Sequence, residues 1–108
     1  MALTLIDSNT QAAAISTEHT LSEQTVANTY VLVVDTAALA LGDIVELRIY
    51  TKVLTGGTAR LAYMVSYANL QGQPNKYSVP VPANIYFKAT LKQVLGTGRS
   101  FPWALLAL

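Results

Sequence analysis

The chain has 108 residues, of which 52% are apolar and 12% are charged, with 7 basic and 6 acidic residues and a net charge of +1. This length predicts a single domain, residues 1–108. So balanced a charge argues against direct binding of nucleic acid, which needs concentrated Lys and Arg. The lack of cysteine excludes disulfides, zinc–thiolate sites and thiol catalysis. No apolar run approaches the ~20 residues of a membrane span. The start has no basic signal-peptide segment, so we expect no membrane partner.

The first third of the chain predicts short strands and one ambiguous segment. We expect a strand over residues 2–7, "ALTLID", and another across Gln11–Thr17. Thr20-Leu21-Ser22-Glu23 matches a helix capping box, but the short β-branched stretch that follows it favours loop or strand. Residues 29–36, "TYVLVVDT", are apolar on both faces, which predicts a central strand.

The middle of the chain predicts a hairpin after a connection over residues 35–43 that allows a short helical turn. Residues 43–54 alternate at period two, with a core face of Val45, Leu47, Ile49, Thr51 and Val53. Residues 60–70 alternate in the same way, with a core face of Leu61, Tyr63, Val65 and Tyr67. Opposed residues share a face. The pattern therefore selects a three-residue loop, Thr55-Gly56-Gly57, that sets Thr51 opposite Leu61 and Ile49 opposite Tyr63.

The last third predicts an edge segment and two more strands. Pro80 and Pro82 cannot donate ladder hydrogen bonds, so their segment belongs at an edge or a crossover. Residues 85–94 place Ile85, Phe87, Ala89 and Leu91 inward, with Tyr86, Lys88 and Lys92 outward. An odd-length hairpin loop, Leu95–Arg99, would then bring Leu91 to face Trp103 in a final strand. Six to eight short strands predict an all-β fold, an antiparallel sandwich or a jelly-roll-like barrel.

No group of residues in the sequence predicts catalysis, a cofactor or a metal site. His19 is the only histidine, and we interpret it as a solvated loop residue. Asp7-Ser8-Asn9 lacks the later ligands of a calcium loop and is typical of a turn. Gly96-Thr97-Gly98-Arg99 lacks the Lys-Ser/Thr of a phosphate-binding loop and indicates a hairpin loop. Asp35 and Asp43 flank one connection, where turn formation explains them.

Two surfaces could bind a partner. The first is a basic and aromatic face formed by Arg48, Lys52, Lys88 and Lys92 with Tyr50 and Tyr86. It is either a solvated sheet face or a contact surface for an acidic partner or a glycan.

The second surface is the C-terminal segment, "SFPWALLAL". Alternation places Phe101, Trp103 and Leu105 in the core. Pro102, Ala104, Leu106 and Leu108 then fall on the outer face, where polar residues are expected. An apolar outer face predicts a contact surface. We expect it to be buried against another chain, or else under a strand of the same chain, with Leu3 and Leu5 as its N-terminal partners.

The runs "TYVLVVDTAALALGDIVELRIYTKVLTGGTARLAY" (29–63) and "ATLKQVLGTGRSFPWALLAL" (89–108) resemble small structural virion proteins of tailed bacteriophages. The nearest functional class is the capsid decoration, or cement, proteins. The resemblance implies a non-enzymatic protein on the capsid exterior whose partner is the major capsid protein, and it supplies no catalytic residue. We also expect a homo-oligomer, a dimer or a trimer. The alternative is a glycan- or ligand-binding β module of a phage tail or fibre, with Tyr50 and Tyr86 as the platform.

Overall fold

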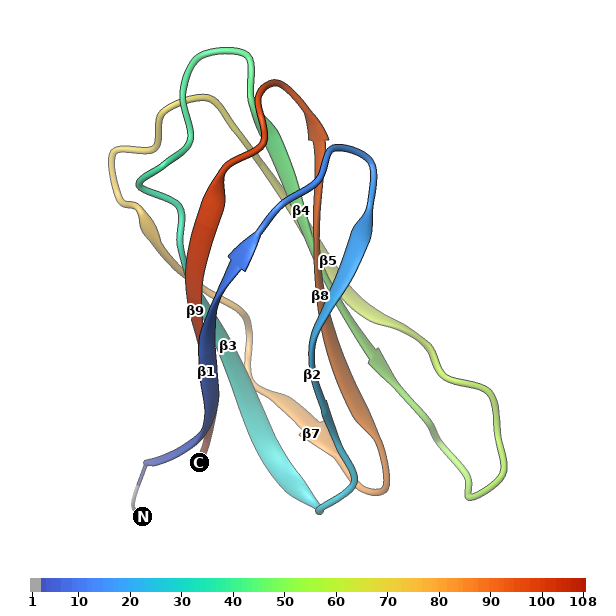
Figure 1. Ribbon diagram of the computed structural model, residues 1–108. Helices are drawn as coiled ribbons and strands as arrows, with labels where there is room; N and C mark the ends of the chain where they lie inside the picture. The colour runs from blue at the N-terminus through green and yellow to red at the C-terminus, as the bar shows by residue number, and fades with distance from the viewer. Residues whose placement is uncertain (1–2) are drawn as a thin grey trace.

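The computed structural model describes residues 3–108 and contains nine strands and no helix in that range (Figure 1). None of its elements could therefore cross a membrane as a helix. The strands are β1 (Thr4–Ala12), β2 (Glu18–Gln24), β3 (Asn28–Asp35), β4 (Ile44–Thr51), β5 (Arg60–Ala68), β6 (Asn75–Tyr77), β7 (Val81–Ala83), β8 (Phe87–Leu95) and β9 (Ser100–Ala107).

The strands form two antiparallel sheets that pack face to face. Sheet A has the order β1-β9-β3-β6, and β7 pairs with β3 along the same edge as β6. Sheet B has the order β2-β8-β4-β5. The chain crosses repeatedly between the sheets, as in the double Greek key of a jelly roll. The predicted antiparallel sandwich is confirmed, with nine strands rather than six to eight, and the jelly-roll-like arrangement does not close into a barrel because each sheet keeps two open edges.

Period-two alternation fills the space between the sheets with apolar side chains. Sheet A contributes Leu32, Phe101 and Leu105, and sheet B contributes Ile49 and Leu91, all of them at most 1% exposed. Full burial of each such side chain contributes roughly 1.5–3 kcal/mol. The central position predicted for residues 29–36 is confirmed, since β3 lies between β9 and β6/β7. Tyr30 of β3 packs on Phe87 of sheet B with ring centroids 4.6 Å apart.

Several local predictions in the first half of the chain are wrong. The N-terminal strand runs on to Ala12, and residues 13–17 form a turn rather than a second strand. The stretch that resembles a capping box lies in β2, which confirms the favoured prediction of loop or strand there. Residues 36–43 contain turns without helix. Asp7-Ser8-Asn9 lies inside β1 rather than in a turn, beside a bulge between Leu5 and Asp7.

The predicted hairpin through Leu95–Arg99 is also wrong, because β8 and β9 belong to different sheets. The loop crosses from one layer to the other instead of closing a ladder. The inward residues of both strands are nevertheless those that alternation selected, except that Ile85 is half-buried and precedes β8. Alternation of apolar and polar residues predicts which face of a strand each side chain lies on, but it does not predict which other strand pairs with that strand. The edge position of Pro82 is confirmed, in the three-residue strand β7.

The hairpin of β4 and β5 has the predicted register up to Ile49, but its end and its loop differ from the prediction. Ile49 lies opposite Tyr63 as predicted, but a bulge at the next position sets Thr51 opposite Arg60 instead of Leu61. The connection spans residues 52–59 rather than three residues. Neighbouring β8 begins at Phe87, opposite Thr51. The sandwich therefore ends there, and Val53 and Leu61 are exposed rather than buried.

Asp43 ties together the loops at one end of the sandwich. Its buried carboxylate accepts hydrogen bonds from the Ala40 amide (2.9 Å), the Thr97 amide (3.1 Å) and the Arg99 Nε (2.8 Å). Its own carbonyl accepts from the Asn69 amide (2.8 Å). The Ala40 hydrogen bond is the largest effect on this carboxyl. With the Arg99 contact and the Thr97 amide it outweighs desolvation and lowers the pKa of Asp43. Asp43 thus forms a turn, as predicted, and also an ion pair that sequence alone did not indicate.

Substitutions at two glycines, one beside the Asp43 carboxylate and one with free space around it, test whether the position of this carboxylate matters for stability. Gly96 and Gly42 both have positive φ, +96° and +91°, but only at Gly96 would an added Cβ overlap Asp43. We expect Gly42→Ala to cost about 1–2 kcal/mol of left-handed strain. Gly96→Ala should cost clearly more, because the carboxylate must also move. Urea denaturation of both variants measures the difference, and equal losses would contradict this role of Asp43.

The lowered pKa of Asp43 predicts how stability depends on pH. A carboxyl with a depressed folded-state pKa contributes stability above its unfolded value of about 3.9, and that contribution is lost as the pH falls through the folded value. Asp43→Asn should therefore be less stable than wild type at pH 7 and should show a flatter decline below about pH 4. Melting temperatures across this range provide the measurement, and parallel curves for the two proteins would count against it.

Candidate protein-contact surface

The outward side of sheet A is apolar across its centre. In the ladder, Leu106 of β9 lies between Leu5 of β1 and Val31 of β3. Two residues away in β9, and on the same side of the sheet, Ala104 lies between Ser8 of β1 and Val33 of β3. Opposed residues share a face, so the surface is built by pairing that brings both ends of the chain together.

We call this surface the apolar face and define it by its members. They are Leu5, Val33, Tyr77, Pro102, Ala104 and Leu106 in the ladder, with Leu3 and Leu108 next to it at the chain ends. Val31 faces the same side but is only 8% exposed. Of the six contact residues predicted from sequence, Leu5, Pro102, Ala104 and Leu106 take their places on it in the ladder, and Leu3 and Leu108 adjoin it at the chain ends. Leu3 and Leu5 are 62% and 60% exposed, and Leu108 is 44% exposed. The alternative of burial under a strand of the same chain does not hold for these three leucines.

The apolar face has an uneven relief. Its N-terminal corner carries the three exposed leucines, Leu3, Leu5 and Leu108. At the other end lies a shallow, open depression of about 310 Å³. The residues that line this depression are Val33, Asp35, Asn75, Tyr77, Pro102, Trp103 and Ala104. Asp35 is the one charged residue among them, and its carboxylate accepts a hydrogen bond from the Ala37 amide (2.9 Å), as the predicted turn requires.

The outward side of sheet B is charged, and its charges bind one another. The carboxylate of Glu46 lies 2.6 Å from Arg48, whose guanidinium also lies 3.9 Å from Glu18. Glu18 accepts hydrogen bonds from the hydroxyls of Tyr50 (2.7 Å) and Thr90 (2.6 Å). Desolvation would raise the pKa of Glu18, but these hydrogen bonds and Arg48 together lower it. We call this surface the polar face. Its charged groups Glu18, Glu46 and Arg48 already form ion pairs or hydrogen bonds within the same chain.

The predicted basic and aromatic surface does assemble on the polar face, but its aromatic rings are covered. The ammonium group of Lys52 lies 4.6 Å from the ring centroid of Tyr86, and that of Lys88 lies 4.8 Å from the ring centroid of Tyr50. Burial and a hydrogen bond to Glu23 (2.6 Å) raise the pKa of Tyr86 to about 12. A sugar ring would have to displace the lysines in order to stack on these tyrosines.

His19 has a structural role rather than that of a solvated loop residue. It lies in β2, half-buried, and its Nε2 accepts a hydrogen bond from the Ala14 amide (3.0 Å), which holds the turn between β1 and β2. Within residues 3–108, no group of three or more His, Asp or Glu side chains could hold a metal ion.

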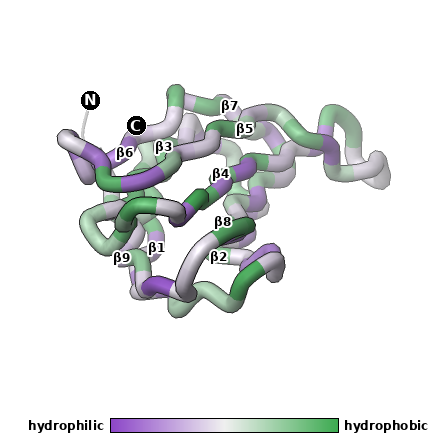
Figure 2. Tube along the Cα trace, turned by 90° about the horizontal axis from the view of Figure 1, so that it is seen from above, coloured by the Kyte–Doolittle hydropathy of each residue, from purple (hydrophilic) through white to green (hydrophobic). Residues whose placement is uncertain are grey.

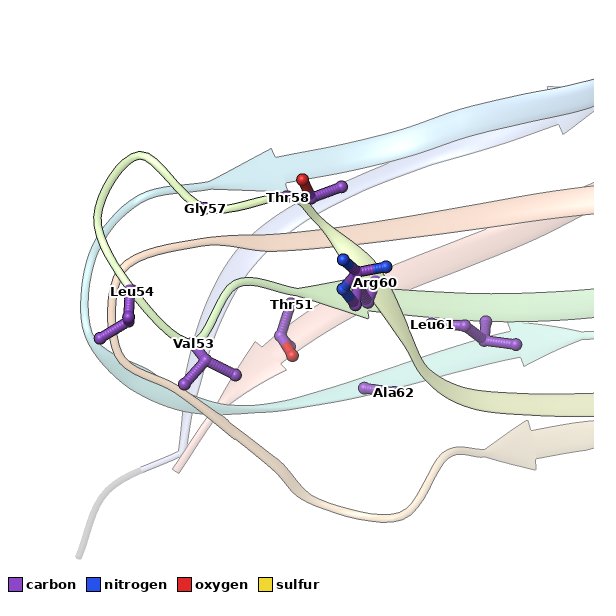
Figure 3. Close-up of a pocket in the computed structure, with 8 residues that line it drawn as sticks. All are labelled: Thr51, Val53, Leu54, Gly57, Thr58, Arg60, Leu61 and Ala62. Atoms are coloured by element: carbon purple, nitrogen blue, oxygen red, sulfur yellow. The ribbon is translucent and has the colours of Figure 1, made fainter.

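The loop between β4 and β5, residues 52–59, is a candidate contact element that the sequence did not reveal. It extends beyond the rest of the molecule in two perpendicular views (Figures 1 and 2). Val53 and Leu54 on it are 87% and 72% exposed. With Arg60 and Leu61 they line an open hollow of about 440 Å³ (Figure 3). The Gly-Gly turn was readable in the sequence. The start of the neighbouring strand β8, on which the exposure of Val53 depends, could not be read from the sequence.

Comparison of the chain with protein-family models, with curated proteins and with solved structures finds no match. The contact surfaces described above are therefore the basis for inferring its function.

Two neighbouring leucines test which side of β9 faces outward. Leu106→Lys places a charge at a half-buried position of the apolar face and should lower stability by about 1 kcal/mol, the centre of the range for point substitutions. Leu105→Lys buries the same charge in the core, where the wild-type residue is fully buried, and should unfold the domain. Circular dichroism during thermal melting separates the two. If Leu106→Lys also unfolds, the apolar face is part of the intramolecular core.

Proposed function

We propose that this chain is a structural virion protein that binds the exterior of a tailed-phage capsid and stabilises it. The phage assignment is supported by the resemblance of residues 29–63 and 89–108 to small virion proteins. The apolar face carries the proposal in physical terms, because none of its members is charged and its leucines Leu3, Leu5 and Leu108 are exposed.

Burial against another chain gives the apolar face a favourable role. A leucine or valine side chain that stays exposed to water lacks up to roughly 1.5–3 kcal/mol of the favourable free energy that full burial would give. A protein that binds only the assembled capsid stabilises it by RT ln(1 + [L]/Kd), about 2.7 kcal/mol per site at a hundredfold excess over Kd. Such a contribution repeats at every site of a symmetric shell.

Glycan binding by a tail or fibre module is the alternative. Tyr50 and Tyr86 would form its platform, but lysine ammonium groups lie over both rings. Trp103, the natural stacking residue, is only 7% exposed. The polar face therefore supports this alternative less well than the apolar face supports binding to a capsid.

Co-sedimentation with empty capsids of the phage that encodes the chain tests the proposal. We expect wild type to pellet with the capsids in a saturable way and Leu106→Lys to remain largely in the supernatant. Ser66→Lys is the matched control, because Ser66 is exposed on the polar face, and it should pellet like wild type. Equal pelleting of all three proteins, or no pelleting of wild type together with a specific signal on a glycan array, would overturn the proposal.

A further inference from the structure

Three of the four sheet edges carry features that discourage pairing with a further strand. Strand β1 has a bulge before Asp7, and β2 has one before Ser22 and carries two glutamates. The edge opposite β1 consists of β6 and β7, which have three residues each and include Pro82. Bulges, charges, prolines and short strands all discourage the pairing of an edge with another chain.

The fourth edge, β5, lacks these features over most of its length. It spans nine residues without proline, and its one charged residue is Arg60 at the start. The irregularity in its pairing with β4 lies at Ala62, after which Tyr63 to Ala68 pair in continuous register. In the described part of the chain, no strand other than β4 pairs with β5. The Gln71 side chain donates a hydrogen bond (2.7 Å) only to the carbonyl of its last residue, Ala68.

The chemistry of this edge specifies the kind of partner that fits it. An edge strand presents a row of unpaired backbone N–H and C=O groups, and their complement is the backbone of another extended strand. The inward side chains of β5, Tyr63, Val65 and Tyr67, pack against the core but are only half-buried. Their cross-strand neighbours in β4, such as Leu47 and Ile49, are at most 3% exposed. A further strand beside β5 would cover its inward side chains as β5 covers those of β4.

The sequence of β5 reads almost the same in both directions. Residues 62–68 are Ala-Tyr-Met-Val-Ser-Tyr-Ala, and only Met64 and Ser66 break the symmetry about Val65. In an antiparallel pair of two copies centred on Val65, tyrosine lies opposite tyrosine and valine opposite valine. Aromatic cross-strand pairs stabilise a sheet and directly opposed like charges destabilise it. This register has two tyrosine pairs and no charged pair.

From these features we propose that two copies of the chain pair antiparallel through β5, about a two-fold axis at Val65, so that sheet B of one continues into sheet B of the other. Such an interface is isologous, with each Met64 opposite the Ser66 of the partner. A second copy is the occupant because its β5 supplies a regular, uncharged strand whose residues match in this register, whereas the other three edges of the chain are blocked. The pairing leaves the outward side of sheet A available, so this inference does not rest on the proposed capsid function.

The absence of cysteine allows a direct test by engineered cross-linking. Opposed residues of an antiparallel ladder alternate between hydrogen-bonded and non-hydrogen-bonded pairs, and the side chains are closer in the second kind. A disulfide needs Cβ atoms about 3.5–4.5 Å apart, so it closes best at a non-hydrogen-bonded pair. Val65 opposite itself and Met64 opposite Ser66 are successive pairs, and one of the two is therefore of this kind. Val65→Cys alone, and Met64→Cys mixed with Ser66→Cys, are oxidised in parallel.

We expect a covalent dimer in at least one of these two samples. Met64→Cys oxidised alone is the matched control, because its two thiols lie diagonally across the axis at positions about 7–8 Å apart, and it should cross-link much less than the mixture. No covalent dimer in either sample, or equal cross-linking of the control and the mixture, would overturn the proposal.

Charge substitutions at the same two exposed positions provide an independent test without oxidation. In the proposed register, Met64→Lys combined with Ser66→Lys sets lysine opposite lysine, whereas Met64→Glu combined with Ser66→Lys sets opposite charges together. Sedimentation velocity should show a dimer for wild type that dissociates on dilution, a dimer for the Glu–Lys variant and a monomer for the Lys–Lys variant. A wild type that is monomeric at every concentration contradicts the pairing. If its residues 63–67 then become protected from hydrogen exchange on capsids, the edge binds a strand of the shell protein instead.

Discussion

The structure depends on the burial of apolar side chains between two sheets that each offer only one face to the core. In β9 each inward residue such as Leu105 is followed by an outward one such as Leu106. The inward set is mostly apolar in both sheets, and the buried Gln93 is hydrogen-bonded. The outward sets differ: sheet B carries linked charges, and sheet A carries leucines, valines and proline. The core explains why the chain folds, and the difference between the outer faces indicates where it meets other molecules.

Polar groups elsewhere in the molecule are engaged within the chain. Asp43 and the fully buried Gln93 each bind more than one group in the loop between β8 and β9, which fixes the passage from sheet B to sheet A. In the described part of the chain, no buried side-chain polar atom lacks a hydrogen-bond partner. Polar groups that already have a hydrogen-bond partner within the chain gain little free energy from binding another molecule. The apolar face and the loop at residues 52–59 expose leucine and valine side chains that would gain from burial, as do Leu41 and Leu70.

Sequence reasoning predicted local features well and the arrangement of neighbours poorly. Alternation identified the inward residues of β4, β8 and β9, and the apolar outward residues of β9. It misjudged Val53, because exposure there depends on where β8 begins. It also predicted a hairpin from β8 to β9, because a short glycine-containing loop can close a ladder or cross between layers. The Asp43–Arg99 pair joins residues 56 positions apart in the chain, a separation that no local pattern encodes.

Hydroxyl-radical footprinting of the chain, free at high dilution and bound in its assembled form, tests the central claim most directly. Tyr77 on the apolar face and Tyr50 on the polar face provide a pair of reactive aromatic probes in one molecule. We expect labelling of Tyr77, Leu5 and Leu108 to fall on assembly while labelling of Tyr50 stays unchanged. Unchanged labelling of Tyr77 together with protection of Tyr50 would place the contact on sheet B and contradict this account.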